Sequence, residues 1–306
     1  MEKNQYQEIN IIDLLSHLQK YKYLITFLTL SLSLVLIVFL LLIPNKFESK
    51  STFYVSTDPG STSSSMRLLS GLSSLGGLSN FSLPSVEVAK HDVAMTKIKS
   101  REFLESLITN EQVMANIYAA KDYNFETNSI VYDKSLYDSS KRHFYNKKGN
   151  VISSPDIDDL HKKYLKMMSI SRNKTTGIMD LSFVHVSPYF AAEIIDLIFI
   201  NLDNDARKES IIELNKSIAY FESKLLLTNE TSLKASLNML MKTKIEQLML
   251  ANVKESYLIN IISKPFVPKY KSAPKKSLFA VVGFFISMIT SILISFLYHF
   301  YIKKSD

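Results

Sequence analysis

The sequence predicts an α+β membrane protein, in which two terminal transmembrane helices flank a central domain with a mixed α/β base and a long protruding helix. Three observations predict this fold class. An apolar run lies near each end of the chain, a long helical pattern without glycine or proline lies in its second half, and short alternating segments surround that pattern. With 306 residues and 46% hydrophobic content, one or two domains are expected.

The two apolar runs cover residues 24–43 and 278–298. Each is about 20 residues long, which matches the hydrocarbon thickness of a bilayer. The first run is too long for the apolar core of a signal peptide and no small-x-small cleavage site follows it, so we expect a retained anchor. The segment between the runs is too polar and too long to be anything but a water-exposed domain. Lysines flank every membrane end, and therefore charge does not set the orientation.

The tail before the first run predicts a short amphipathic helix at the membrane surface. Ile11, Leu14, Leu15 and Leu18 recur at helical spacing and are followed by a lysine- and tyrosine-rich stretch. Both tails are short, and two spans place them on the same side of the membrane.

The first half of the central domain begins with a strand over residues 47–55, rich in aromatic and β-branched residues. Residues 60–85 are rich in serine, glycine and leucine. They form either a mobile loop or a segment whose leucines are buried against a neighbouring subunit. Two helices follow, over residues 86–99 and 101–109, with Ser100 as the cap between them.

The next segment, residues 122–154, is polar and tyrosine-rich and is expected to be a loop with at most one short hairpin. Ser154 as cap and Pro155 at the first helical position then start a helix that runs to about residue 168. Two strands follow over residues 169–172 and 178–186. A last strand over 257–262 is expected to pair with the first, because both lead to membrane spans.

Residues 187–256 carry the long helical pattern. A single helix over 189–227 would be about 60 Å long. A polar break at 228–232 separates it from a second periodic run. Two interpretations stay open: a helical hairpin packed on its own domain, or a stalk that buries its apolar stripes between subunits as a coiled coil.

This order divides the chain into five parts. They are an N-terminal tail (1–23), a first transmembrane helix (24–43), a central domain (44–277), a second transmembrane helix (278–298) and a C-terminal tail (299–306). The central domain consists of an α/β base (44–186), the helical stalk (187–256) and a strand with a proline-rich connector (257–277).

Two sets of residues beside and within the second span are candidate functional positions. Prolines and lysines form a stiff connector that cannot join a helix or a central strand. Small residues four apart within the span form one face, which either packs against the first span or another subunit or occurs by chance. The connector residues are Pro265, Pro268, Pro274, Lys275 and Lys276, and the small residues are Gly283, Ser287, Ser291 and Ser295.

The sequence does not indicate an enzyme. It contains no phosphate-binding, dinucleotide-binding, serine-hydrolase or zinc-protease motif and no cysteine, so no cofactor is expected. His161 near Asp158 and Asp159 is a weak metal site, although a solvated helix face explains these residues better. The net charge of +7 is scattered or lies beside the spans, which indicates anionic lipid headgroups rather than nucleic acid as its partner.

Five short motifs carry a resemblance to a known family. They are Ile11-Ile12-Asp13-Leu14-Leu15, Lys99-Ser100-Arg101-Glu102-Phe103-Leu104, His185-Val186-Ser187-Pro188 followed by Ala191-Ala192, Met249-Leu250-Ala251-Asn252-Val253, and Ala273-Pro274-Lys275-Lys276-Ser277-Leu278. In this order, between two terminal spans, they resemble the Wzz-type polysaccharide co-polymerases, the O-antigen chain-length determinant family. The second span of that family is often richer in glycine than this one, which has Gly283 alone.

The resemblance implies a bacterial inner-membrane protein with both termini in the cytoplasm and the central domain in the periplasm. It implies a ring-like homo-oligomer that sets the modal length of O-antigen made by a Wzy-type polymerase. Expected partners are other copies of the chain, the polymerase, the growing lipid-linked polysaccharide and membrane lipids. Because the chain stops at Asp306, the fused tyrosine kinase of some members is not expected.

Two other functions stay open. One is an adaptor of the same architecture that controls the length or export of capsule, exopolysaccharide or enterobacterial common antigen. The other is a two-span sensor with a periplasmic ligand domain, which is disfavoured because only a few residues follow the second span.

Overall fold

The computed structural model describes residues 19–56, 86–146 and 148–305. The chain forms two compact units, one made of its two ends (Met1–Asn45 and Ser272–Asp306) and one of its centre (Lys46–Lys271). The predicted fold class is confirmed, with two apolar helices, a mixed α/β body and a long helix. The expected amphipathic helix around residues 11–18 and the serine-rich segment 60–85 lie outside the described residues.

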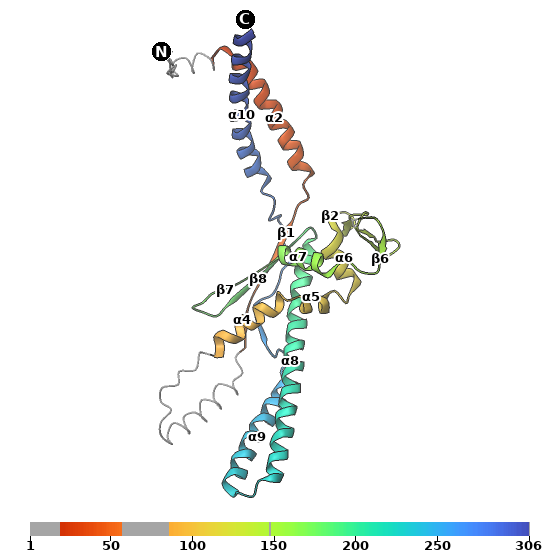
Figure 1. The fold of residues 1–306 in the computed structure, drawn as a ribbon, viewed down its shortest axis with the longest axis vertical. Helices are drawn as coiled ribbons and strands as arrows, with labels where there is room; N and C mark the ends of the chain where they lie inside the picture. Colours follow the sequence, from red (N-terminus) through yellow and green to blue (C-terminus); the bar gives the residue numbers. More distant parts are fainter. Residues whose placement is uncertain (1–18, 57–85, 147, 306) are drawn as a thin grey trace, which may run out of the picture. The chain divides into compact units, whose positions relative to one another are not determined.

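The first unit is a pair of antiparallel helices. Helix α2 (Lys22–Leu42) and helix α10 (Lys276–Ser305) lie side by side in Figure 1. Both have the length and hydropathy of membrane spans, over Lys22–Leu42 and Lys276–Tyr298. The chain is therefore a membrane protein with a central domain between two terminal apolar helices.

The centre of the second unit is a four-stranded antiparallel sheet. Its strands are β1 (Phe47–Val55), β7 (Met168–Arg172), β8 (Met179–His185) and β9 (Ile259–Ser263), in the order β7-β8-β1-β9. The expected pairing of the first and last strands is confirmed, with Val55 opposite Ile259. Alternate residues of β1 are buried, as the period of a strand requires. The ring of Phe53 meets that of Phe199 on the long helix, with centroids 4.9 Å apart.

Four shorter helices pack around this sheet: α4 (Val86–Ile98), α5 (Arg101–Leu107), α6 (Glu111–Ala119) and α7 (Ile157–Met167). The Ser100 cap is confirmed, because its hydroxyl accepts the N–H of Phe103. The predicted start of α7 is wrong by two residues. The carboxylate of Asp156, not the hydroxyl of Ser154, accepts a backbone N–H, and Pro155 precedes the cap.

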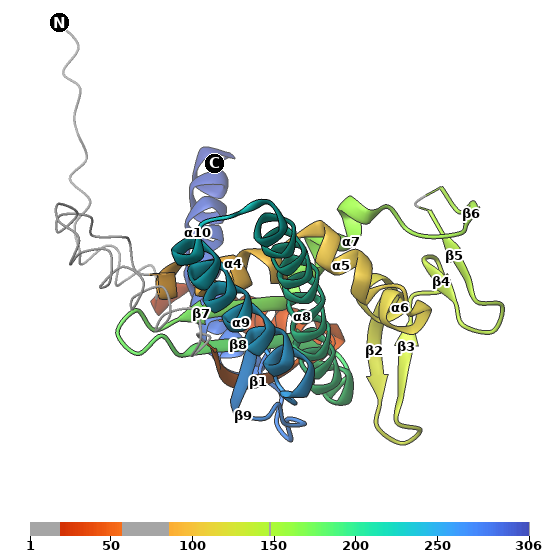
Figure 2. The ribbon, with the colours of Figure 1, turned by 90° about the horizontal axis from the view of Figure 1, so that it is seen from below.

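The prediction of a loop with at most one short hairpin over residues 122–154 is wrong, because three more strands follow the hairpin. The hairpin of β2 (Ala120–Asn124) and β3 (Ser129–Tyr132) is followed by a small sheet of β4 (Tyr137–Asp138), β5 (His143–Tyr145) and β6 (Val151–Ile152). In Figures 1 and 2 these strands gather beside α6, on the opposite side of the long helix from β7. Contacts between aromatic rings hold them together; the ring centroids of Tyr137 and Phe144 lie 4.6 Å apart.

The long helix α8 (Pro188–Leu227) and helix α9 (Thr231–Val253) form the stalk, with the predicted polar break between them. Ser187 caps α8 by accepting the N–H of Phe190, and Pro188 occupies the first turn. The buried residues of α8 lie between Pro188 and Leu202, except for Leu214. Only the first part of α8 therefore belongs to the core, and the remainder runs alongside α9.

Candidate functional site

The small residues of the second span face the first span. Ser287, Ser291 and Ser295 are fully buried, and the hydroxyls of Thr29 and Ser291 lie 2.8 Å apart. A Cβ atom added at Gly283 would lie only 3.2 Å from the Leu36 side chain. Small residues at this spacing let two helices approach closely in a membrane. The small residues of the second span therefore lie at the contact between α2 and α10 of one chain, which we call the seam.

The connector divides between the two units. In the central unit, two buried serines of β1 donate hydrogen bonds to its backbone, Ser51 to the carbonyl of Ser263 at 2.6 Å and Ser49 to that of Phe266 at 2.8 Å. These bonds hold the backbone on either side of Pro265 along β1. They also satisfy hydroxyls that would otherwise be buried unpaired in the sheet. Pro268 follows in the same unit.

The rest of the connector leads into α10. The carbonyl of Pro274 accepts the N–H of Lys276 at 2.8 Å, and that of Lys275 accepts the N–H of Phe279. Lys276 is the first residue of the helix, and its ammonium group lies 3.4 Å from the carbonyl of Leu41 near the end of α2. A cation is favourable there because the carbonyl end of a helix carries partial negative charge.

An ion pair fixes the root of the stalk. The carboxylate of Asp203 accepts the backbone N–H groups of Tyr257, Leu258 and Ile259, at 2.7 to 3.1 Å. Arg207, one turn later, pairs with Asp203 at 3.2 Å. The returning chain is therefore held at the point where it leaves α9 and enters β9.

Arg207 also binds three backbone carbonyls at the end of α9, those of Ala251, Lys254 and Glu255. Burial alone would raise the pKa of Asp203, but the backbone donors and Arg207 outweigh burial, so its pKa lies below the ordinary value. The carboxylate is charged at neutral pH. Its i,i+4 spacing from Arg207 is visible in the sequence, but which segment the pair holds is not.

From this root to its tip the stalk presents apolar side chains to its surroundings. They lie on both helices and near the turn between them. The exposed members are Ile212, Tyr220, Leu226 and Leu227 on α8 and Leu233, Met239, Met249, Leu250 and Val253 on α9. A soluble surface rarely keeps so many large apolar side chains on one projection, and such a surface commonly marks an interface.

The weak metal site suggested by the sequence is occupied by other contacts. Nε2 of His161 lies 2.7 Å from the carbonyl of Lys99, and Asp158 forms an ion pair with Arg101. Within the described ranges, no group of three or more histidine, cysteine or acidic side chains is placed to hold a metal ion.

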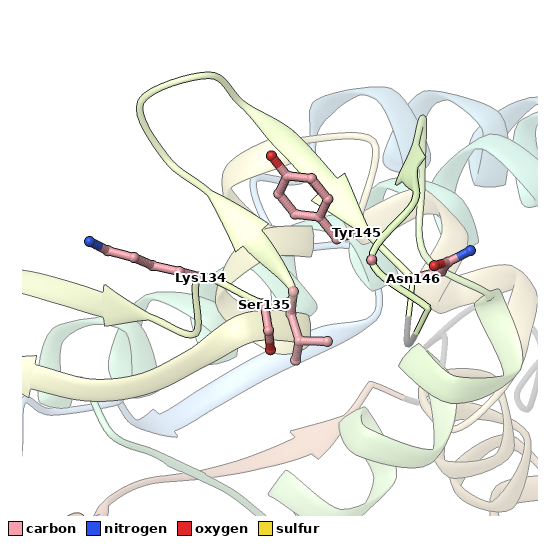
Figure 3. Close-up of a pocket in the computed structure, with 6 residues that line it drawn as sticks. Lys134, Ser135, Tyr145 and Asn146 are labelled. Carbon is pink, nitrogen blue, oxygen red and sulfur yellow. The ribbon is translucent and has the colours of Figure 1, made fainter.

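Two clefts of the central unit lie around the short strands between residues 120 and 152. One, of about 540 Å³, is lined by Lys134, Ser135, Tyr145 and Asn146, among others (Figure 3). Figure 3 shows these side chains diverging, so they do not converge on one ligand atom. Another cleft, of about 800 Å³, lies between α6, the β2–β3 hairpin and the first turn of α8.

Comparison with known proteins gives structural neighbours only. No family model matches the chain, and no curated protein matches it. A full-length bacterial polysaccharide co-polymerase is similar over 96% of this chain and 99% of its own, with 12% identity and a TM-score of 0.43. A fragment of WzzB, a polysaccharide co-polymerase from Salmonella Typhimurium, covers 75% of this chain and 100% of its own, with 12% identity and a TM-score of 0.33.

The sequence motifs named above lie at structural positions in this chain. Ser100 caps α5, His185 ends β8, and Ser187 caps α8. The 249–253 motif ends α9, next to the carbonyls that Arg207 binds. Four of the five motifs lie at least partly among the described residues, and these mark ends of elements rather than a catalytic centre.

Proposed function

We propose that this protein is a polysaccharide co-polymerase, a non-enzymatic inner-membrane scaffold that sets the modal length of O-antigen made by a Wzy-type polymerase. The observation that carries the proposal is the stalk. Outside the core, both helices of the stalk leave apolar side chains exposed. A second copy of the chain can bury these side chains in every subunit at once. The order of the sequence motifs between two terminal spans supports the same conclusion.

In this proposal both termini lie in the cytoplasm and the central domain lies in the periplasm. The scaffold assembles through its stalks into a closed ring, and the growing lipid-linked polysaccharide and the polymerase meet it on its periplasmic surface. The bonds from Ser49 and Ser51 to the connector, and those of Asp203 to β9, support a rigid base on which such an assembly can be built. Membrane lipids contact the lysines beside the spans.

The test is a lipopolysaccharide gel from a strain that lacks this gene, compared with the same strain carrying it on a plasmid. We expect the deletion to convert a clustered ladder into an unregulated, mostly short distribution, and complementation to restore the cluster. An unchanged ladder would show that the protein does not control O-antigen length in this strain. The same comparison on capsule, exopolysaccharide and enterobacterial common antigen would then identify the regulated polymer.

Stalk variants link the gel to the structure. Replacing both Ile212 and Leu226 by serine should reduce assembly size, measured by cross-linking in the membrane, and should abolish the clustered ladder. Val151→Ser is the control, because Val151 is 57% exposed, close to the 55% of Ile212, but lies on β6. If the stalk variant assembles and regulates normally while the deletion does not, the interface lies elsewhere.

A further inference from the structure

The cleft of about 800 Å³ is formed by segments that are far apart in the sequence. Gln112 and Asn116 come from α6, Tyr123 and Tyr132 from the β2–β3 hairpin, and Tyr189 from the first turn of α8. Its volume lies within the range of small-molecule sites, about 300 to 1,000 Å³. Helices and strands, rather than long loops, hold most of its walls.

One wall is aromatic. The rings of Tyr123 and Tyr189 lie with centroids 6.3 Å apart, and Phe125 packs edge-on against Tyr123 at 5.0 Å. Tyr123 is buried and its ring packs against Phe125, whereas Tyr189 is 54% exposed. The capped first turn of α8 fixes the backbone that carries Tyr189. An exposed ring on a rigid support offers a flat apolar face at little cost in side-chain entropy.

The floor is polar and ordered. The side-chain amide of Gln112 donates to the hydroxyl of Tyr132 at 3.0 Å, and that hydroxyl donates to Asn116 at 2.7 Å. Burial, followed by the nearby Tyr137, raises the pKa of Tyr132 to about 12, so the phenol keeps its proton. This relay orients the amide of Gln112 and leaves its oxygen and second N–H for a ligand.

Further hydrogen-bonding groups surround the aromatic wall. Glu193 lies one helical turn after Tyr189 and therefore on the same face of α8, and its carboxylate has no hydrogen-bond or ion-pair partner in the part of the chain that the structure describes. Asn128, at the tip of the hairpin with φ of 48°, accepts a bond from Tyr123 and keeps its amide N–H groups.

The charge of the lining selects the class of ligand. Of the described residues that line the cleft, Glu193 is charged and none is lysine or arginine. Phosphates, uronic acids and other anions are therefore disfavoured. A sugar ring has one face of C–H groups and a rim of hydroxyls, which match an aromatic wall and a polar floor. A protonated amine on such a ring would pair with Glu193.

We infer that this cleft binds a neutral or amino-bearing sugar unit of the growing polysaccharide. The face of Tyr189 stacks on the ring, and Gln112, Asn128 and Glu193 bond its substituents. The identity of the source as the polymer rests on the proposed function. The site gives the scaffold a point of contact with sugar that is separate from its stalk interface.

The test is titration of the purified full-length protein, in a detergent without a sugar headgroup, with fragments of one to three repeat units released by mild acid from the strain's own polysaccharide. Saturation-transfer NMR detects the contact and calorimetry gives the Kd. Tyr189→Ala should weaken binding about tenfold, and Tyr189→Phe should retain most of it. Tyr54→Ala is the control, because Tyr54 is 44% exposed on β1 and lines neither the cleft nor the stalk. It should bind as the wild type does.

A second variant tests the charge argument. Glu193→Gln should weaken binding of glucosamine-containing fragments and leave neutral fragments unchanged, because only the amine gains from a carboxylate. The inference is wrong if no fragment binds the wild type at millimolar concentration, if Tyr189→Ala binds as tightly as the wild type, or if acidic fragments bind best.

The gel separates this inference from the proposed function. If the wild-type gene does not restore the clustered ladder, the proposed function fails whatever the titration gives. If the wild-type gene restores it and the titration shows no binding, only the cleft inference fails. Elution volume and circular dichroism of each variant verify that it is folded.

Discussion

The two halves of helix α8 carry the same kind of apolar pattern and have opposite surroundings. From Pro188 to Leu202 the pattern is buried against the sheet and its helices, whereas beyond Arg207 only Leu214 is buried and four of the nine large apolar side chains of α8 are exposed. Helical periodicity indicates that a face is to be covered, but it does not say by what. The first half is covered by its own domain, and the second half is covered only in part, by α9.

The boundary between the halves is a definite structure. Asp203 and Arg207 hold the backbone of the returning chain at the level where burial of α8 ends. Before this pair, α8 is part of the hydrophobic core of the central unit. After the pair the helix runs alongside α9, apart from contacts of Glu209 with Lys97 and of Ser210 with Tyr257 close to the pair. The following predictions test this division, from the largest expected effect to the smallest.

Replacing one isoleucine in each half of α8 by alanine should show the difference between the two halves. Ile198→Ala removes a fully buried side chain and should lower the free energy of unfolding by about 2–5 kcal/mol. Ile212→Ala removes one that is 55% exposed and should change it by less than about 0.5 kcal/mol. Denaturant unfolding of the full chain, in detergent that keeps it monomeric, gives both values. A loss of several kcal/mol in Ile212→Ala would contradict the division.

Acid should destabilise the buried half through His185. Burial, offset in part by its bonds to Asn116 and Ser187, lowers the pKa of this histidine from 6.5 to about 4. The unfolded chain therefore binds the proton more readily, and the stability that His185 contributes is complete above pH 6.5 and is lost as the pH falls toward 4. The total loss is about 3 kcal/mol.

Unfolding curves at pH 7.5, 5.5 and 4.5 measure this loss, with His185→Gln as the reference. The variant should be less stable at pH 7.5 and less sensitive to pH over this range. An equal pH dependence in variant and wild type would assign the loss to other groups. Asp203 does not contribute to the slope between pH 5.5 and 7.5, because its pKa lies below its ordinary value in the fold.

Removing the charge at the stalk root should loosen the boundary. Asp203→Asn weakens the acceptor of three backbone N–H groups and should cost about 1–3 kcal/mol. The amides of Tyr257 and Leu258 should then exchange faster with solvent. Asp205→Asn is the control on the same helix. Its contact with Lys97 is 4.0 Å long and partly exposed, so its effect should be below about 1 kcal/mol. Equal effects of the two variants would contradict a special role for Asp203.

Substitutions between the two membrane helices should have the smallest effects on stability. The effects of two neighbouring serines should differ in sign. Ser291→Ala removes the bond to Thr29 and should weaken the helix pair by about 0.6 kcal/mol. The hydroxyl of Ser287 is buried without a hydrogen-bond partner in the described residues, so Ser287→Ala should be neutral or slightly stabilising. Unfolding in mixed micelles compares them. A larger loss for Ser287→Ala would contradict this arrangement of the seam.

The sequence predicts the regular elements of the fold well and the small strands poorly. The strand over 47–55 and the helix that ends at residue 227 are predicted almost to the residue, because a period of 2 or 3.6 repeats often enough to be recognised. The strands between 120 and 152 have two to five residues each, too few to show a period. Contacts between aromatic rings, which leave no periodic pattern in the sequence, hold these strands together.

The candidate sites follow the same rule. The small residues of the second span repeat every four positions and are visible in the sequence, and the structure places them at the seam. The aromatic cleft combines single residues from α6, a hairpin and α8, and no local pattern links Gln112 to Tyr189. The Asp203–Arg207 pair is visible as a spacing, but its targets lie about 50 residues away, and only the fold brings them together.

The pairing of β1 with β9 has a consequence for how this protein can be altered. The chain enters the central unit at Lys46 and leaves it at Lys271, through neighbouring strands of one sheet. A unit whose two ends lie together can be exchanged as a block, because its replacement leaves the host chain's connections unchanged. Residues 46–271 are thus a natural cassette, and swapping them between relatives would assign length control to the central unit or to the membrane helices.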